Sequence, residues 1–278
     1  MRAFKTWRYI WCATVILLLL PAISIGQDRA AGSSLTPRQL EIEKQRLRLG
    51  SAEVEERRDA LTRLGSMGHP EASRAALTAL RDPLPLVRAT AAASILYLPS
   101  DEAAASLIPL LSDKDEFVRR EAAYALGKTR SKAAVSRLSE VLLTDKEDAV
   151  RGSAAVALGQ IADAAAVVPL STVLSPQFAM PSSKKNKKPR QEQNAFVLRS
   201  AARALGQIGN RAGLPALIVV LQDEKAGDDL RRESATSLGR IGDSSSLPAL
   251  RTALTATDPY LAQAANEAIR RISNSTLP

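Results

Sequence analysis

The chain has 278 residues, a length that allows one or two domains and a sizeable hydrophobic core without disulfide or metal cross-links. It contains one cysteine, Cys12, and one histidine, His69, so disulfide frameworks, Cys-based zinc sites, thiol nucleophiles and His-rich metal centres are excluded. The formal net charge of +9 is distributed unevenly along the chain.

The first 26 residues have the features of a secretory signal peptide. Cations at positions 2, 5 and 8 precede an apolar stretch over residues 9–25, and small residues follow Pro21. This order predicts cleavage after Gly26 and export to the periplasm or the cell exterior. The alternative is an uncleaved inner-membrane anchor, because roughly 17 apolar residues is near the lower limit for spanning a bilayer. Pro21 and the small residues favour cleavage.

Residues 27–50 are predicted to form a linker and an N-terminal capping helix. The helix is expected from Pro37 to Leu49, with Thr36 as its N-cap. Because this segment is charged on most sides, we expect it to cover the front end of the repeats that follow.

One ten-residue pattern recurs along the remaining chain. Its clearest copies are Val118–Gly127, Val150–Gly159 and Leu230–Gly239, and weaker copies begin at positions 56, 87, 197 and 261. The second residue of each copy falls at 57, 88, 119, 151, 198, 231 and 262, which gives intervals of 31, 31, 32, 47, 33 and 31. A period of this length indicates a solenoid of stacked two-helix units.

Each copy predicts a first helix, helix A, because apolar residues recur at i, i+4, i+7 and i+8. In most copies a leucine is followed by a glycine, such as Gly127. This glycine is expected at the left-handed C′ position that ends the helix. A second apolar pattern at i, i+3 and i+7 predicts helix B, which an Asp-containing turn follows. The predicted fold class is therefore all-α, a right-handed α-solenoid of about six stacked HEAT-like repeats over residues 51–272. Residues 259–272 would form the rear cap, and residues 273–278 a tail.

The repeated phrase V-R-x-x-A-A-x-A-L-G-x-I-G, with L-P-x-L opening the next helix, resembles the short HEAT-like repeat named after phycobilisome lyases. The resemblance covers roughly residues 51–272. It implies the fold but not the function, because related solenoids serve enzymes, adaptors and transport scaffolds.

Arginine recurs at one repeat position, and three aspartates each stand six residues before one of these arginines. We predict a structural ladder in which the carboxylates accept guanidinium hydrogen bonds in the turns between hairpins, as the resemblance also implies. The alternative is a cationic stripe for an anionic ligand, which matched carboxylates disfavour. The predicted ladder residues are Asp82, Arg88, Asp113, Arg119, Asp145, Arg151 and Arg231, and Arg57 shares their repeat position.

The 47-residue interval implies an insert, residues 176–194, whose three prolines and like charges predict disorder. The signal peptide carries three cations and residues 182–194 carry a net +4, so only +2 of the total +9 remains for the rest of the chain. The insert is a candidate contact for anionic lipid, an acidic polymer or an acidic partner, and a solvated loop without a ligand is the simpler interpretation. No aromatic residue interleaves its lysines, so nucleic acid is not expected. The candidate residues are Lys184, Lys185, Lys187, Lys188 and Arg190.

No catalytic, cofactor-binding or metal-binding residue is predicted. His69 stands alone between Gly68 and Pro70, as a turn residue would, and no phosphate loop or nucleophile–base–acid set is present. The resemblance suggests three enzyme classes, and a feature of the sequence speaks against each of them. Export opposes a cytoplasmic bilin lyase, a single histidine opposes the di-iron deoxyhypusine hydroxylases, and the lack of tryptophan after Trp11 opposes the HEAT-like DNA glycosylases.

We therefore expect an exported, non-catalytic scaffold that binds a protein or peptide partner on the concave, helix-B surface of the solenoid. Arg137, Glu140 and Arg251 are the candidate charged residues of this surface. Neighbouring candidates are Ser136, Ser139, Thr172, Val219 and Thr252. The alternatives are a HEAT-like enzyme or lyase-type chaperone, and an envelope-tethered adaptor that uses the basic insert.

Overall fold

The computed structural model describes residues 35–175 and 190–275, and the chain divides into two units, Met1–Thr36 and Pro37–Pro278. The predicted signal peptide, residues 1–26, lies outside the described residues. All helices of the described residues belong to the second unit. Among them, no helix is both long and apolar enough to cross a membrane.

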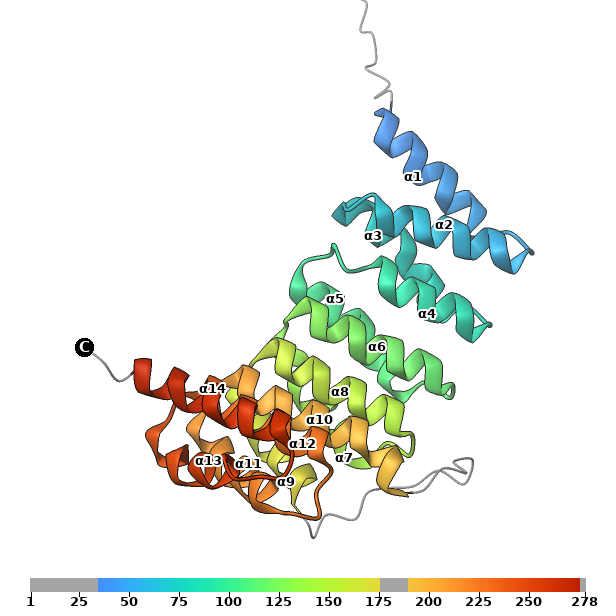
Figure 1. The fold of residues 1–278 in the computed structure, drawn as a ribbon. Coiled ribbons are helices and arrows are strands. Elements are labelled where there is room, and N and C mark those ends of the chain that lie inside the picture. The colour runs from blue at the N-terminus through green and yellow to red at the C-terminus, as the bar shows by residue number, and fades with distance from the viewer. Residues whose placement is uncertain (1–34, 176–189, 276–278) are drawn as a thin grey trace, which may run out of the picture. The chain divides into compact units, whose positions relative to one another are not determined.

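The described residues form α-helices and short 3-10 segments and contain no strand, which confirms the all-α solenoid class (Figure 1). After α1 (Pro37–Arg48), two sets of helices alternate along the chain. The A helices are α2 (Val54–Ser66), α4 (Pro85–Ser94), α6 (Glu116–Thr129), α8 (Asp148–Ile161), α10 (Arg190–Ile208), α12 (Asp228–Ile241) and α14 (Pro259–Ser275). The B helices are α3 (Pro70–Ala76), α5 (Ser100–Leu107), α7 (Val135–Thr144), α9 (Val167–Leu174), α11 (Leu214–Gln222) and α13 (Leu247–Ala253).

The A helices and the B helices form two layers of the second unit. Each A helix packs against the next A helix from α2 to α14, and α7, α9, α11 and α13 pack in the same way in the B layer (Figure 1). In the first repeats, 3-10 segments at Leu77–Arg81 and Ile108–Ser112 extend α3 and α5. Helix α1 packs on α2 and α3 at one end of the stack, and α14 packs on α12 and α13 at the other.

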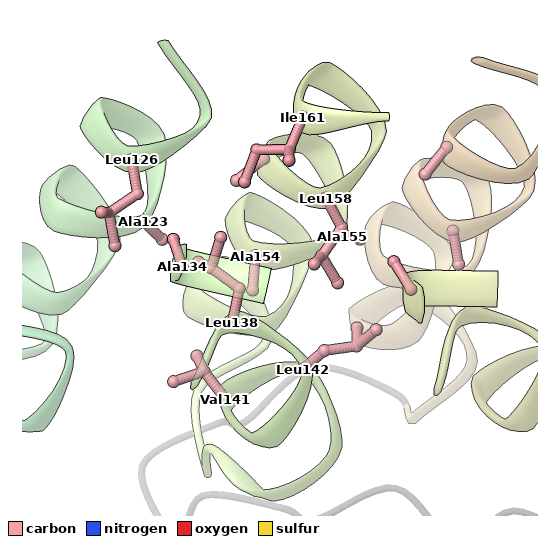
Figure 2. Packing of buried hydrophobic residues seen from close by; sticks show 14 of the residues in the cluster. Ala123, Leu126, Ala134, Leu138, Val141, Leu142, Ala154, Ala155, Leu158 and Ile161 are labelled. Atoms are coloured by element: carbon pink, nitrogen blue, oxygen red, sulfur yellow. The ribbon is translucent and has the colours of Figure 1, made fainter. Parts of the chain in front are cut away.

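Small and aliphatic side chains fill the space between the layers. Figure 2 shows Leu138, Val141 and Leu142 of α7 beside Leu126 of α6 and Leu158 of α8. Each fully buried leucine contributes roughly 1.5–3 kcal/mol to folding. Alanines such as Ala123, Ala154 and Ala155 are buried among these leucines, where their small size lets neighbouring helices approach closely.

The prediction that the glycine after the leucine ends each A helix is wrong. Gly127 lies inside α6, and a Cβ added there would come within 2.8 Å of the Cα of Ala157 on the next A helix. Gly239 lies inside α12, and a Cβ added there would come within 2.7 Å of the Cα of Ala268 on α14. These glycines are therefore points of close helix–helix approach. The left-handed cap falls three residues later, as at Gly242, where φ is 76° and the N–H bonds the Leu238 carbonyl.

Candidate functional site

A ladder of arginine–aspartate pairs joins the turns that lead from one repeat into the next. In the pair of Arg88 and Asp113, guanidinium Nε and Nη2 each donate to a different carboxylate oxygen at 2.7 Å. Such a bidentate, charge-assisted pair is among the strongest hydrogen-bond arrangements in proteins. We call each such pair a rung. Two further rungs have the same geometry. The Nε and Nη2 distances to the carboxylate oxygens are 2.8 and 3.1 Å in Arg57–Asp82, and 2.7 and 3.1 Å in Arg119–Asp145.

Each arginine pairs with the aspartate of the next turn, which lies 25 or 26 residues later in sequence. The residue six positions earlier, which is Ser51 for Arg57 and an aspartate for the other two arginines, contributes its backbone carbonyl instead. In the case of Arg88, Nη1 donates to the Asp82 carbonyl at 2.8 Å while Asp113 supplies the carboxylate. One arginine therefore connects two successive turns. Sequence reasoning identified the residue types of the ladder but missed this register.

The rungs are largely withdrawn from solvent, since their six side chains are only 8–12% exposed. Burial alone would raise the pKa of Asp113, but hydrogen bonds from Arg88 and from the Asp115 N–H outweigh it and hold that pKa below its ordinary value. The hydrogen bond that Arg119 donates to the Asp145 carboxylate stabilises the charged guanidinium and raises the pKa of Arg119. In the rung of Arg88 and Asp113, the arginine pKa is raised and the aspartate pKa is lowered, so both groups are charged when the protein is folded at neutral pH.

The ladder changes at Arg151, whose side chain is completely buried. Its Nη1 donates to the Asp145 carbonyl at 2.6 Å, as in the other rungs, but its acidic partner is Asp148 of the same helix. Positions 176 and 177, where the next ladder aspartate would fall, are proline and glutamine. Burial lowers the pKa of Arg151 and raises the pKa of Asp148, the opposite of the directions at Asp113 and Arg119.

Arg231 does not form a predicted rung. Its Nε donates to the Leu221 carbonyl at 3.1 Å, and Asp258 instead accepts from Arg232 Nε at 2.6 Å. The reason lies in the following turn: position 256, which is 25 residues after Arg231 and would hold the ladder aspartate, is alanine. Asp258 is the N-cap of α14, because it also accepts the N–H groups of Tyr260 and Leu261, as Asp115 accepts those of Phe117 and Val118 at the start of α6.

The ladder breaks between α10 and α12. Asp223 follows Leu198 by 25 residues, the same separation as in the rung of Arg88 and Asp113, so Leu198 occupies the place of a ladder arginine. Asp223 keeps the ladder turn, because its Oδ1 accepts the Lys225 N–H at 2.9 Å. The three rung aspartates accept the N–H two residues ahead at the same distance. No cation pairs with Asp223 among the residues that the structure describes, and its side chain is exposed.

A cavity of about 660 Å³ opens at this break, between α9, α10, α11 and α12, and we call it the ladder-break cavity. On its rim Asp229 accepts from both Arg199, at 3.2 Å, and Arg232, at 2.9 Å, so these cations are already paired. The apolar walls are Val173, Leu174, Leu198, Val219, Val220 and Leu230. The charged rim is Arg199, Asp223, Lys225, Asp228, Asp229 and Arg232.

A second cavity, of about 730 Å³, lies between α5 and the two 3-10 segments Leu77–Arg81 and Ile108–Ser112. It includes Leu80, Pro109 and Asp113. Asp113 is held by Arg88, so the rung beside this cavity is complete. The described residues contain no group of three or more histidine, cysteine or acidic side chains placed to hold a metal ion.

The remaining residues that the sequence predicts as candidates do not lie together in one site. Arg137 bonds the Ser112 hydroxyl at 2.6 Å and pairs with Glu140 on its own helix, α7, whereas Arg251 is exposed on α13. Helices α9 and α11 lie between these two elements.

His69 is the N-cap of α3, and its Nδ1 accepts the Glu71 N–H at 3.3 Å. Of the candidate polyanion contacts, Lys184, Lys185, Lys187 and Lys188 lie outside the described residues, and Arg190 is the first residue of α10.

Comparison with known proteins identifies the repeat family. A family model for HEAT repeats matches residues 74–159, 104–175 and 190–270. No curated protein matches the chain. Among solved structures, the complex of CpcE and CpcF of phycocyanin lyase from Nostoc sp. PCC7120 is 23% identical over 88% of this chain and 90% of that one, with a TM-score of 0.49.

Two other solved structures are similar to a comparable extent. Human deoxyhypusine hydroxylase in complex with glycerol is 18% identical, covering 84% of this chain and 96% of that chain with a TM-score of 0.41. A designed armadillo repeat protein in complex with the peptide (KR)4 is 17% identical, covering 84% and 99% with a TM-score of 0.41. The family model spans well over half of the sequence. The chain therefore belongs to the HEAT repeat family.

Proposed function

We propose that this protein is an exported, non-catalytic scaffold that binds a protein or peptide partner on the surface of its solenoid. The observation that carries the proposal is the ladder-break cavity. In the earlier repeats a guanidinium pairs with the aspartate of this turn, whereas Leu198 has no group that could pair with Asp223 on the rim of this cavity. A cavity with apolar walls and a few charged groups on its rim suits an amphipathic side chain of another protein.

The use of the ionisable groups supports a scaffold rather than an enzyme. Groups with strongly shifted pKa values can mark catalytic sites. Here the shifts at Arg88, Asp113 and Arg119 come from ion pairs that join one repeat to the next. These side chains serve the stacking of repeats, and their carboxylate and guanidinium groups are already bound to each other.

Export is the part of the proposal that the N-terminal sequence supports. Cleavage after Gly26 would produce a mature protein that begins at Gln27. Edman sequencing or terminal-peptide mass spectrometry of the protein from its native host tests this directly. A protein that keeps residues 1–26 and sediments with membranes would contradict cleavage and establish the anchor instead.

Partner binding can be tested by site-specific photo-crosslinking in the native host. A photoreactive amino acid at Val219, which is 48% exposed and lines the ladder-break cavity, is expected to capture a partner. The same probe at Gln263, exposed on α14, is the control. The captured protein must then form a saturable complex with the scaffold from purified components. Failure to form any such complex, together with turnover of a small molecule by the purified protein, would overturn the proposal.

A further inference from the structure

We propose that the ladder-break cavity binds the side chain of an arginine from a protein partner, with the guanidinium group on the carboxylate of Asp223. This inference rests on the proposed scaffold function and specifies the chemistry of its partner. In effect, the partner would supply the rung that this chain lacks between α10 and α12.

The complete rungs provide the template for this site. In each of them, guanidinium Nε and Nη2 lie 2.7–3.1 Å from the two carboxylate oxygens of an aspartate in the following turn. Asp223 is the aspartate of the corresponding turn, 25 residues after Leu198, and the Lys225 N–H holds its carboxylate as the other rung aspartates are held. The acceptor half of a rung is therefore present without its donor.

Among the described residues, the place of the missing side chain forms part of the ladder-break cavity. Leu198 ends at its Cδ atoms and has no group that could reach Asp223 with a hydrogen bond. Its side chain and the Asp223 carboxylate both line the cavity. The three rung aspartates have side chains only 8–12% exposed, whereas Asp223 is exposed. The exposure of Asp223 is what the removal of a covering guanidinium would produce.

The walls and rim favour arginine over other ligands. Leu198, Val220 and Leu230 can cover the aliphatic part of a long side chain while its charged end reaches the rim. Arg199 and Arg232 are already bound to Asp229, and Lys225 gives Asp223 only its backbone N–H, so no cation of the described rim pairs with the Asp223 carboxylate. A guanidinium presents two parallel N–H donors that match a carboxylate, whereas a lysine ammonium makes only a point contact.

The test measures binding of a labelled peptide by fluorescence anisotropy. The probe is fluorescein-Gly-Ala-Leu-Arg-Leu-Ala-Gly, and its counterpart carries citrulline, which is uncharged and of nearly the same shape, in place of arginine. We expect the citrulline peptide to bind about tenfold or more weakly, and Asp223→Asn to reduce arginine-peptide affinity by a similar factor. Glu224→Gln removes the same charge at the next residue, which is exposed and outside the cavity lining, and is the matched control.

A second variant supplies the missing rung within the chain. Leu198→Arg should place a guanidinium on Asp223, raise the thermal unfolding temperature and abolish binding of the arginine peptide. Ala93→Arg adds a cation at an exposed position of α4 and should leave peptide affinity unchanged. The two variants change the site in opposite ways, because Asp223→Asn removes the acceptor and Leu198→Arg occupies it. If one of these two variants fails to fold, peptide binding by the other still tests the proposal.

Several outcomes would overturn the inference. These are no binding of the arginine peptide, equal binding of the citrulline peptide, or equal affinity in Asp223→Asn. Binding that appears only after the cations of residues 184–190 are replaced by glutamine would show that the occupant belongs to this chain. If Leu198→Arg still captures the partner through the Val219 crosslink, the scaffold function stands while the arginine site is wrong.

Discussion

Arg88 illustrates how single residues connect the repeats. Its guanidinium bonds the backbone of the turn before its own helix and the carboxylate of Asp113 in the following turn. Because both side chains are about one-tenth exposed, the loss of one partner leaves the other charged and poorly solvated. The stability of the N-terminal repeats should therefore depend on each member of a rung.

We predict that Asp113→Asn lowers the free energy of unfolding by about 3 kcal/mol, the usual effect of removing one partner from a buried ion pair. Urea unfolding followed by circular dichroism measures the change. Glu116→Gln, an exposed acid three residues away, should change stability by less than about 0.5 kcal/mol and serves as the control. A loss for Asp113→Asn no larger than that of the control would show that the rung does not stabilise the fold.

The two buried aspartates with shifted pKa values should give opposite pH dependences. The pKa of Asp113 is lowered in the folded protein, so its stabilising effect is fully present above the unfolded value of 3.8 and is lost as the pH falls below it. The pKa of Asp148 is raised by burial, so its ionisation weakens the folded state as the pH rises above 3.8. Asp113→Asn should therefore reduce the acid-induced loss of stability between pH 5 and pH 2, and Asp148→Asn should increase it. Urea midpoints across this range are the measurement, and parallel pH profiles for both variants and the parent protein would contradict the assignment.

At the scale of the helices, the glycines inside the A layer control how closely neighbouring repeats approach. Gly239 of α12 faces the backbone of α14, where an added Cβ would lie 2.7 Å from both Cα and Cβ of Ala268. Alanine normally stabilises a helix interior relative to glycine by about 1 kcal/mol. At Gly239 the contact with the α14 backbone opposes this gain, because an added methyl group would force the two helices apart.

We predict that Gly239→Ala destabilises the protein by roughly 1–3 kcal/mol, as overpacking of a close helix contact does. Gly227→Ala is the comparison, since an added Cβ there meets no atom within 4 Å. Thermal unfolding of the two variants should separate them by several degrees. Equal or increased stability for Gly239→Ala would mean that the two helices can separate without cost.

The helices themselves follow from the sequence, but two features of their packing do not. Glycine suits both a left-handed cap and a close helix contact, so the pattern around Gly127 could not distinguish the two, and the structure shows the second. The ladder has a similar ambiguity. In a repeat of 31 residues, an aspartate six residues before one arginine is also 25 residues after the previous one, as Asp82 is for Arg88 and Arg57.

The candidate site became recognisable only when the register was known. Leu198 was visible in the sequence as a repeat position without arginine, and Asp223 as an acidic residue in a long turn. Their relation depends on which turn the arginine reaches, and this is determined by the packing of α10 against α12. A comparison of every ladder position with the residue 25 places later would have found the break.

At the scale of the whole molecule, charge and repeat architecture are separated along the sequence. Residues 182–194 carry a net +4, whereas the sequence outside this segment and the signal peptide carries only +2. Near an anionic membrane surface each basic residue contributes about 1 kcal/mol of attraction, which falls within a Debye length. Any attraction of the mature protein to polyanions should therefore originate in the segment of residues 182–194 and not in the rest of the helical layers.

We predict that replacing its five cations by glutamine reduces retention of the mature protein on vesicles rich in phosphatidylglycerol by at least about tenfold at low salt. The effect should decrease as salt is added, because screening acts on exposed charges. The control replaces Arg240, Arg251, Arg270 and Arg271, which are exposed on α12, α13 and α14, and should have a smaller effect because acids lie among them along the chain. Cosedimentation measures both variants. Unchanged retention after neutralisation of the segment would exclude an electrostatic tether and leave the ladder-break cavity as the contact to be tested first.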